Sequence, residues 1–303
     1  MSTTTTATTS AAVRANERTR RRVRRLALHA FLLAAAVIWL FPLLWALYTS
    51  FRPYEDTALN GYVSFTGNLN LDNYENAWVR AELPKYFLNT AIIVAPATVI
   101  VLFLASMMAF ATSRFSWRFN VTLLLLFTAA NLLPPQVIIT PLYRMYLALP
   151  LPPILSDNGL FYDQYVGIMM IHIAFQLGFC TFVLSNYMKT LPIELNEAAF
   201  VDGASVWRIF WTITLPLTRP ALAALAVLQV TWMYNDFFWA LILMRTGAKY
   251  PITSGLNNLK GQFFTDNNLV AAGAIMVALP TLIVFFVLQK QFGRGLTLGS
   301  TKG

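Results

Sequence analysis

The chain has 303 residues, of which 57% are apolar and 12% are charged. So few charged residues cannot cover a soluble protein of this length, which excludes an ordinary soluble enzyme and indicates a membrane protein. The net charge of +9 does not indicate nucleic-acid binding, because the basic residues lie at the edges of apolar segments.

Residues 1–25 are predicted to form a basic, partly disordered cytoplasmic tail, because Ser, Thr and Ala dominate residues 1–12 and cannot bury a core. The arginines of residues 20–25 are expected to hold the first span against anionic lipid. A cleaved signal peptide is the alternative for the first apolar run. That run is longer than a signal-peptide core and no small-residue cleavage site follows it, so we expect a permanent anchor.

Six apolar runs are long enough to cross the hydrocarbon core, which takes about 20 residues of helix. They form a predicted transmembrane domain over residues 26–292, followed by a flexible cytoplasmic tail at residues 293–303. The predicted spans are Leu26–Tyr48, Phe87–Ser113, Phe119–Leu147, Tyr165–Met188, Leu217–Met244 and Leu269–Gln289.

The charges flanking these runs predict their orientation. Fifteen of the 22 Lys and Arg residues flank alternate spans on the side of the N-terminus, whereas most of the 13 acidic residues lie on the opposite side. Loops rich in Lys and Arg stay in the cytoplasm. Both termini are therefore predicted to be cytoplasmic, in the inner membrane of a bacterial cell.

The cytoplasmic loop between the fourth and fifth spans, residues 190–216, is unusually apolar. Thr190 is a predicted N-cap, and Gly203 permits the turn that ends the helix after it. Ser205 caps a second short helix, which carries Trp207 and Trp211 and ends before Pro216. Physical reasoning leaves two interpretations open, a docking element for a partner protein or an amphipathic linker at the membrane surface.

The same loop resembles a known family motif. Its residues Glu197, Ala198, Ala199, Gly203, Ile213, Leu215 and Pro216 match in type and spacing the EAA loop of binding-protein-dependent ABC importer permeases, and Asp202 and Ala204 fit the form found in sugar importers. The segment FLNT at residues 87–90, Pro134-Pro135 and the C-terminal GLTLGSTKG are similar to the smaller permease subunit of maltose-type carbohydrate importers.

This resemblance implies an all-α integral membrane protein, a type I ABC importer permease with six transmembrane helices and a cytoplasmic coupling helix between helices four and five. Glu197 would pair with the ATPase, Ala198 and Ala199 would pack closely against it, and Gly203 would make the turn. The implied partners are an ABC ATPase dimer, a second homologous permease and an extracytoplasmic solute-binding protein, which would meet the outer loop at residues 245–268. The implied substrate is a carbohydrate.

No phosphate-binding loop of the form GxxxxGK[ST] occurs in the chain, so we expect no ATPase activity of its own. Bound cofactors are not expected in this chain, and ATP and Mg would belong to the partner ATPase. No metal site is expected either, because His29 and His172 stand alone and Cys180 is the single cysteine. A membrane-embedded enzyme is disfavoured because no catalytic motif lies beside the spans.

Four residues are candidates for the substrate pathway: Asn131, Tyr234, Asn235 and Asp236. Asn131 precedes Pro134-Pro135, which marks either a broken helix beside a cavity or a packing kink. Asp236 either bonds substrate hydroxyls or lies solvated at the interface. The aromatic residues near it, including Trp232, fit a sugar-stacking surface or an interfacial belt. An alternative overall function is a secondary transporter or channel driven by an ion gradient, which would need a carboxylate at the midplane.

Overall fold

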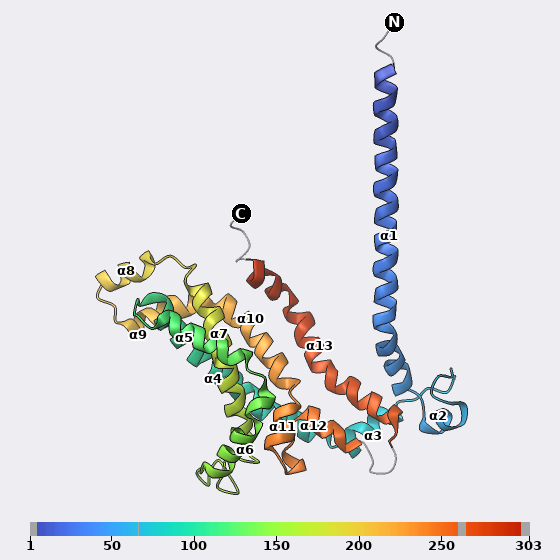
Figure 1. Cartoon of the computed structure of the whole chain (residues 1–303). Coiled ribbons are helices and arrows are strands. Elements are labelled where there is room, and N and C mark those ends of the chain that lie inside the picture. The colour runs from blue at the N-terminus through green and yellow to red at the C-terminus, as the bar shows by residue number, and fades with distance from the viewer. Residues whose placement is uncertain (1–4, 66, 260–264, 298–303) are drawn as a thin grey trace.

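The computed structural model describes residues 5–65, 67–259 and 265–297, without the side chains of residues 5–19, 130–132, 258 and 287–297. These residues form helices, turns and one isolated β-bridge between Pro150 and Leu160. Figure 1 shows that α8 and α9 lie at the same end of the molecule as the chain termini, and that α2, α3, α6 and α11 lie at the opposite end. We call these two ends the α8 end and the α3 end.

Within the described residues, five helices are long and apolar enough to cross a membrane, so the chain is a multi-pass membrane protein. Four of the six predicted spans are confirmed as parts of single long helices. Those helices are α1 (Thr5–Ser50), α4 (Leu83–Arg114), α7 (Tyr165–Met188) and α13 (Asn267–Thr297).

The predicted third span, Phe119–Leu147, is not one helix. It is divided into α5 (Asn120–Leu132), a 3₁₀ turn at Pro135–Ile138 and α6 (Ile139–Ala148). Pro134 is extended, with φ −60° and ψ 127°, because a residue before proline disfavours the helical region and neither proline has an N–H group. The two prolines therefore break the helix, and the predicted count of six spanning helices is not confirmed.

The predicted fifth span, Leu217–Met244, is also wrong as a single helix. The helix α10 (Leu215–Tyr234) ends at the C-cap Asn235, and a separate α11 (Phe238–Leu243) follows. The carboxylate of Asp236 accepts a hydrogen bond from the backbone N–H of Trp239 at 3.3 Å. Asp and Asn stabilise helix ends better than helix interiors, which accounts for the break.

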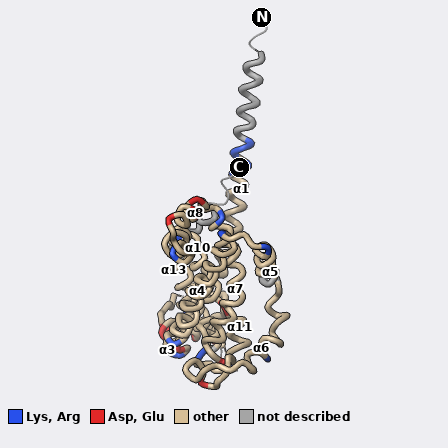
Figure 2. Tube along the Cα trace, turned by 90° about the vertical axis from the view of Figure 1, so that its left-hand side faces the viewer, with Lys and Arg blue, Asp and Glu red and all other residues tan. Residues whose placement is uncertain are grey.

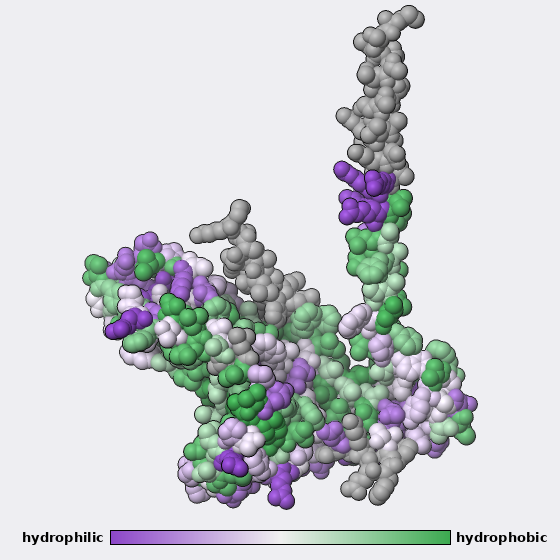
Figure 3. Space-filling view, viewed as in Figure 1, coloured by the Kyte–Doolittle hydropathy of each residue, from purple (hydrophilic) through white to green (hydrophobic). Residues whose placement is uncertain are grey.

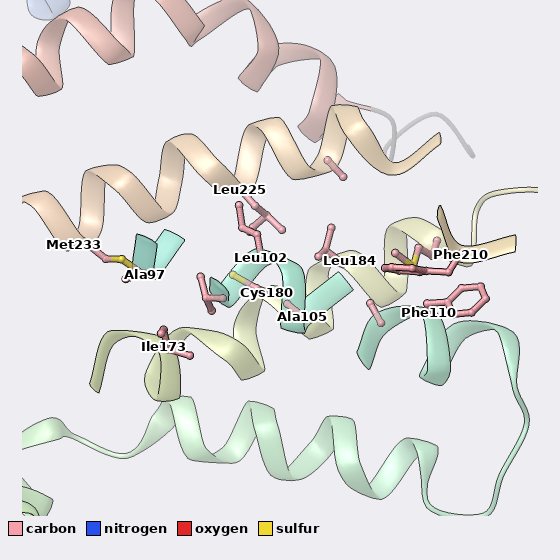
Figure 4. Packing of buried hydrophobic residues seen from close by; sticks show 14 of the residues in the cluster. Ala97, Leu102, Ala105, Phe110, Ile173, Cys180, Leu184, Phe210, Leu225 and Met233 are labelled. Carbon is pink, nitrogen blue, oxygen red and sulfur yellow. The ribbon is translucent and has the colours of Figure 1, made fainter. Parts of the chain in front are cut away.

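Helices α4, α7 and α10 pack around the largest apolar cluster (Figure 4). Along α4, Ala97, Val101, Ala105 and Ala109 recur every fourth residue and are fully buried. Residues four apart share a helix face, and small side chains on that face allow a neighbouring helix to approach closely. This packing places the ends of α7 and α10 that lie at the α8 end beside each other, where the loop between them begins and ends.

Helix α1 stands apart from this bundle and contacts α13 (Figure 1). None of its most apolar 18-residue window is buried within the chain, and Figure 3 shows hydrophobic residues covering its described length below a hydrophilic band. The band consists of the exposed residues Arg20, Arg21, Arg22, Arg24 and Arg25. Figure 2 places basic residues of α1 at the α8 end.

The two predicted tails overlap these long helices. The backbone is helical from Thr5, so part of the predicted N-terminal tail continues α1, consistent with the high helix propensity of Ala and Arg. At the other end α13 reaches Thr297, and residues 298–303 lie outside the described residues. The domain boundaries at residues 25 and 292 stay predictions.

Buried polar side chains hold the α3 end together where α1 meets α2 (Tyr54–Asn60), α3 (Asp72–Arg80) and α13. Arg52 is fully buried, and its guanidinium lies 2.6 Å from the carboxylate of Asp56. The side-chain amide of Asn73 donates to the backbone carbonyl of Arg52 at 2.7 Å, and that of Asn268 donates to the same carbonyl at 3.0 Å. The sequence placed Asn268 on the outer loop. In the structure it is buried in the first turn of α13, and its hydrogen bond holds α13 to the end of α1.

A second polar cluster at the α3 end joins the loop before α7 to the loop after α11. One carboxylate oxygen of Asp163 accepts from the backbone N–H groups of Arg245 and Thr246, and the other accepts from the Thr246 hydroxyl at 2.6 Å. Burial acts to raise the pKa of Asp163, but these hydrogen bonds outweigh burial and the pKa lies below its usual value. Lys249 lies 2.8 Å from Asp157, and hydrogen bonds from Lys249 and then Gln164 lower the pKa of Asp157 to about 2.

Candidate functional site

The loop between α7 and α10 forms two short helices. The first, α8 (Glu194–Val201), begins two residues after Pro192, and Ile193 at its N-cap position makes no side-chain hydrogen bond to it. Thr190 is therefore not the N-cap that the sequence predicted. Its hydroxyl donates to the Tyr187 carbonyl at 2.7 Å and extends the end of α7 instead.

Backbone hydrogen bonds close α8. The N–H of Gly203 donates to the Phe200 carbonyl at 3.0 Å, and the N–H of Ala204 donates to the Ala199 carbonyl at 2.9 Å. This pair of bonds is the Schellman arrangement, which needs a left-handed residue after the helix. Gly203 occupies that position with φ +77°, so the tight turn predicted at this glycine is present. A Cβ added there would meet no atom within 4 Å, so the constraint is backbone conformation and not space.

The second helix, α9 (Val206–Ile209), begins at the predicted cap, because the Ser205 hydroxyl accepts the Arg208 N–H at 3.3 Å. It continues through one π-helical turn at Phe210–Thr214 into α10, where Leu215 and Pro216 form the first positions. Proline has no N–H to donate, so it is tolerated at the start of a helix and a looser turn is favoured just before it.

Each of the two helices divides into a buried and an exposed face. In α8, Asn196 and Ala199 are buried, whereas Glu197 and Ala198 are exposed. The sequence led us to expect both alanines to pack against the ATPase, but only Ala198 lies on the exposed face of α8. Ala199 packs into the cluster of α4, α7 and α10, and Ile213 and Leu215 pack against the same cluster.

The exposed face of the loop is apolar and acidic. Val201 is 88% exposed and Trp207 is 56% exposed, and the acidic side chains of Glu194, Glu197 and Asp202 lie on the same loop. By contrast, Phe210 is buried against Phe110 of α4 with ring centroids 5.4 Å apart. An exposed apolar surface of this kind, rimmed by charges, is typical of a protein-interaction site.

The structure separates the four predicted pathway residues. The Tyr234 side chain is buried and its hydroxyl donates to the Val277 carbonyl of α13 at 2.8 Å, so Tyr234 holds two helices together. Asp236 is mostly buried and accepts the Trp239 N–H of α11, whereas Asn235 is exposed. Asn131 lies in α5, and its side chain is outside the described residues.

The structure thus combines long apolar helices with an exposed helix–turn–helix loop between α7 and α10, which is the arrangement expected of a transport permease. The chain belongs to the family described as "Binding-protein-dependent transport system inner membrane component", which matches residues 101–297. It is therefore a transport permease subunit of the ABC importer class.

Two relatives show the extent of the similarity. The chain is 33% identical over 286 residues to the "Osmoprotective compounds uptake permease protein GgtD" of Synechocystis sp., covering 92% of this chain and 93% of the relative. It is 30% identical over 240 residues to the "Melibiose/raffinose/stachyose import permease protein MelC" of Bacillus subtilis, covering 79% and 83%.

The fold is similar to that of a subunit in the crystal structure of a bacterial ABC transporter involved in the import of the acidic polysaccharide alginate. The TM-score is 0.75 at 20% sequence identity, over 89% of this chain and 96% of the other. This similarity establishes the type I ABC importer permease fold.

Proposed function

We propose that this chain forms half of the translocation pathway of a carbohydrate importer in a bacterial inner membrane. The observation that carries the proposal is the α8–α9 loop, whose backbone is closed by the Gly203 turn while Glu197, Ala198 and Val201 remain exposed. The carbohydrate assignment is supported by MelC, a relative that is named for the import of melibiose, raffinose and stachyose.

In this proposal the α8 end faces the cytoplasm, since α1 carries its arginines there. A separate ABC ATPase dimer binds the exposed loop and supplies ATP and Mg. A second, homologous permease forms the other half of the pathway, and an extracytoplasmic solute-binding protein delivers the sugar to the α3 end. One of the solved transporter structures similar to this chain contains a periplasmic protein with a bound alginate pentasaccharide, which supports a delivery protein of this kind.

The mechanism proposed is alternating access. Closure of the ATPase subunits on ATP draws the two coupling loops together, and the pathway opens outward; hydrolysis returns it inward. The chain itself supplies a rigid lever for this step, because Phe210 and Ile209 are buried in the cluster of α4, α7 and α10. Movement of α8 is therefore passed directly to helices that cross the membrane.

Affinity purification of the tagged chain from its native host in mild detergent tests the assembly. An ABC ATPase and a second permease should be recovered with it and identified by mass spectrometry. Ala198→Trp, on the exposed face of α8, should lose the ATPase. The matched control Val63→Trp alters a residue 83% exposed near α2 at the α3 end and should retain it. Recovery of the chain alone, or equal recovery in both variants, would contradict the proposal.

Uptake tests the substrate. A strain lacking this chain should lose uptake of at least one labelled oligosaccharide from a panel that includes melibiose, raffinose and stachyose, and the restored gene should return it. Unchanged uptake of every sugar, together with lost uptake of a non-sugar solute, would remove the carbohydrate assignment and leave the permease assignment intact.

A further inference from the structure

A line of polar side chains runs between α7 and α10. On α7, His172, Gln176 and Cys180 are four residues apart and share one face. The Gln229 amide on α10 donates to the sulfur of Cys180 at 3.1 Å and to the Gln176 carbonyl oxygen at 3.4 Å. Nearer the α3 end, Nε2 of His172 lies 3.7 Å from a carboxylate oxygen of Asp236. We call these five residues the α7/α10 seam.

Two oxygens of the seam have no hydrogen-bond partner among the described residues. Gln229 is fully buried, and its side-chain carbonyl oxygen accepts no hydrogen bond. The carboxylate oxygen of Asp236 nearest to His172 also has none, since 3.7 Å is too long for one. A buried acceptor without a donor is costly in an apolar environment. Both oxygens are enclosed by the chain, so the glutamine of the seam that a ligand can reach is the partly buried Gln176.

An exposed aromatic residue lies beside the seam. Trp232 is three residues after Gln229 on α10, is 45% exposed, and contacts Phe179 of α7 with ring centroids 5.4 Å apart. Asn235 follows three residues later and is exposed. Trp232 therefore lies one helical turn beyond the seam, with Asn235 at the C-cap of α10 after it.

The position of Gln176 along α7 indicates the environment of this helix face. Gln176 is only partly buried and is the twelfth of the 24 residues of α7, which puts its amide near the middle of the span. Polar side chains at that depth face the bundle interior or a water-filled cavity and avoid lipid. In the proposed importer, a wall of the aqueous pathway would meet this requirement for the face that carries Gln176 and Trp232.

We infer that Gln176 and Trp232 form a saccharide-binding subsite in the pathway wall. Trp232 stacks on a sugar ring, the Gln176 amide bonds the sugar hydroxyls, and the buried Gln229 holds Gln176 in place through their hydrogen bond. An aromatic face beside a side-chain amide suits a ligand that is apolar on its ring face and rich in hydroxyls at its edge. This inference rests on the proposed carbohydrate transport. It moves the substrate contacts away from Tyr234, whose hydroxyl is bonded to Val277.

Transport kinetics of the complete importer in proteoliposomes, with the most actively transported sugar of the panel, test the stacking role. Trp232→Leu should raise the KM roughly three- to tenfold, the range expected for loss of an aromatic contact. Trp232→Phe keeps an aromatic ring and should have a KM close to that of the wild type. The control Trp39→Leu alters a residue 80% exposed on α1 and should leave the KM unchanged. An unchanged KM in Trp232→Leu would overturn the inference.

Cysteine labelling tests the pathway wall without relying on affinity. In a Cys180→Ser background of the complete importer, Gln176→Cys should react with a membrane-impermeant methanethiosulfonate at least about tenfold faster than Phe285→Cys, a residue 53% exposed on α13. The transported sugar should slow the reaction. A Gln176→Cys as unreactive as Phe285→Cys would mean that lipid or the second permease covers this face and would refute the subsite.

Failure of the subsite and failure of the proposed function give different results. If wild-type importer transports a sugar but Gln176→Cys is unreactive and Trp232→Leu keeps the wild-type KM, the subsite alone is refuted. If the wild-type chain transports no sugar, the carbohydrate function is refuted, and the subsite with it.

Discussion

The two ends of the molecule are held together in different ways. At the α3 end, charged side chains form ion pairs within the chain. The three salt bridges of Lys or Arg found within the described residues all lie there. At the α8 end, the loop is closed by backbone hydrogen bonds around Gly203, and its acidic side chains Glu194, Glu197 and Asp202 are exposed.

This difference indicates which end presents free side chains to a partner protein. Loops whose charges are paired within the chain keep their shape alone. A loop that is shaped by its backbone leaves its side chains free for another protein, and α8 buries only the face that contains Asn196 and Ala199. In the proposed importer the α8 end is a preformed docking surface, and substitutions at the two ends should have separable effects on transport and on stability.

The largest expected effect comes from Gly203→Val. A β-branched residue at φ +77° costs about 1–2 kcal/mol and displaces the turn between α8 and α9, so sugar uptake should fall at least tenfold while the protein remains in the membrane. Gly159→Val is the matched control, since Gly159 has φ +73° and equally open space but lies in the loop before α7 at the α3 end. It should cost similar stability and retain most uptake; equal uptake loss in both variants would remove the special role of the loop.

Adjacent alanines should separate docking from folding. Ala199→Leu overfills a buried position that is 9% exposed and should lower the free energy of unfolding by about 1–3 kcal/mol. Ala198→Leu alters an exposed position and should change stability by less than about 0.5 kcal/mol. Thermal unfolding of the purified variants in detergent measures both, and a reversed order would show that the two faces of α8 have been assigned wrongly.

A loss of stability of similar size, with no effect on docking, is expected at the α3 end from Asp163→Ala. The variant removes three hydrogen bonds to a carboxylate, so the free energy of unfolding should fall by about 2–3 kcal/mol, with ATPase binding unaffected. Asp163→Asn is the control, because it keeps one acceptor oxygen and tolerates the left-handed backbone of φ +63°. It should lose less stability than Asp163→Ala, as judged by thermal unfolding. A loss of ATPase binding in either variant would contradict the separation of the two ends.

The smallest effect is the pH dependence of the Lys249–Asp157 pair. The pKa of Asp157 in the folded chain is about 2, below the ordinary 3.8, so its stabilisation is present above pH 4 and is lost as pH falls toward 2. Because Asp157 is exposed, the loss should be small. Unfolding temperatures measured from pH 6 to pH 3 should fall less steeply in Lys249→Met than in the wild type, and parallel curves would show that Lys249 does not cause the shift.

Much of the fold was predictable from sequence because long apolar runs without proline pairs have one stable form in a membrane. The breaks at Pro134-Pro135 and after Tyr234 were harder to predict, since apolar composition continues through both while the backbone does not. In the loop, Gly203 and Ser205 were predictable from local conformational rules.

The opposed faces of Ala198 and Ala199 depend on how α8 packs against the membrane helices, which no local pattern gives. Gln176 and Gln229 were missed for a related reason. A single glutamine in an apolar run has no characteristic spacing to other residues. Polar side chains are rare within membrane spans, however, so each glutamine could have been singled out as a functional candidate.

The central claim is that the exposed face of α8 binds the ATPase, and site-specific photo-crosslinking tests it most directly. A benzophenone amino acid at position 198 should crosslink to the ATPase subunit in native membranes, whereas the same group at exposed position 63, at the α3 end, should not. Crosslinking of position 198 to lipid or to the solute-binding protein, with no ATPase adduct, would contradict the account.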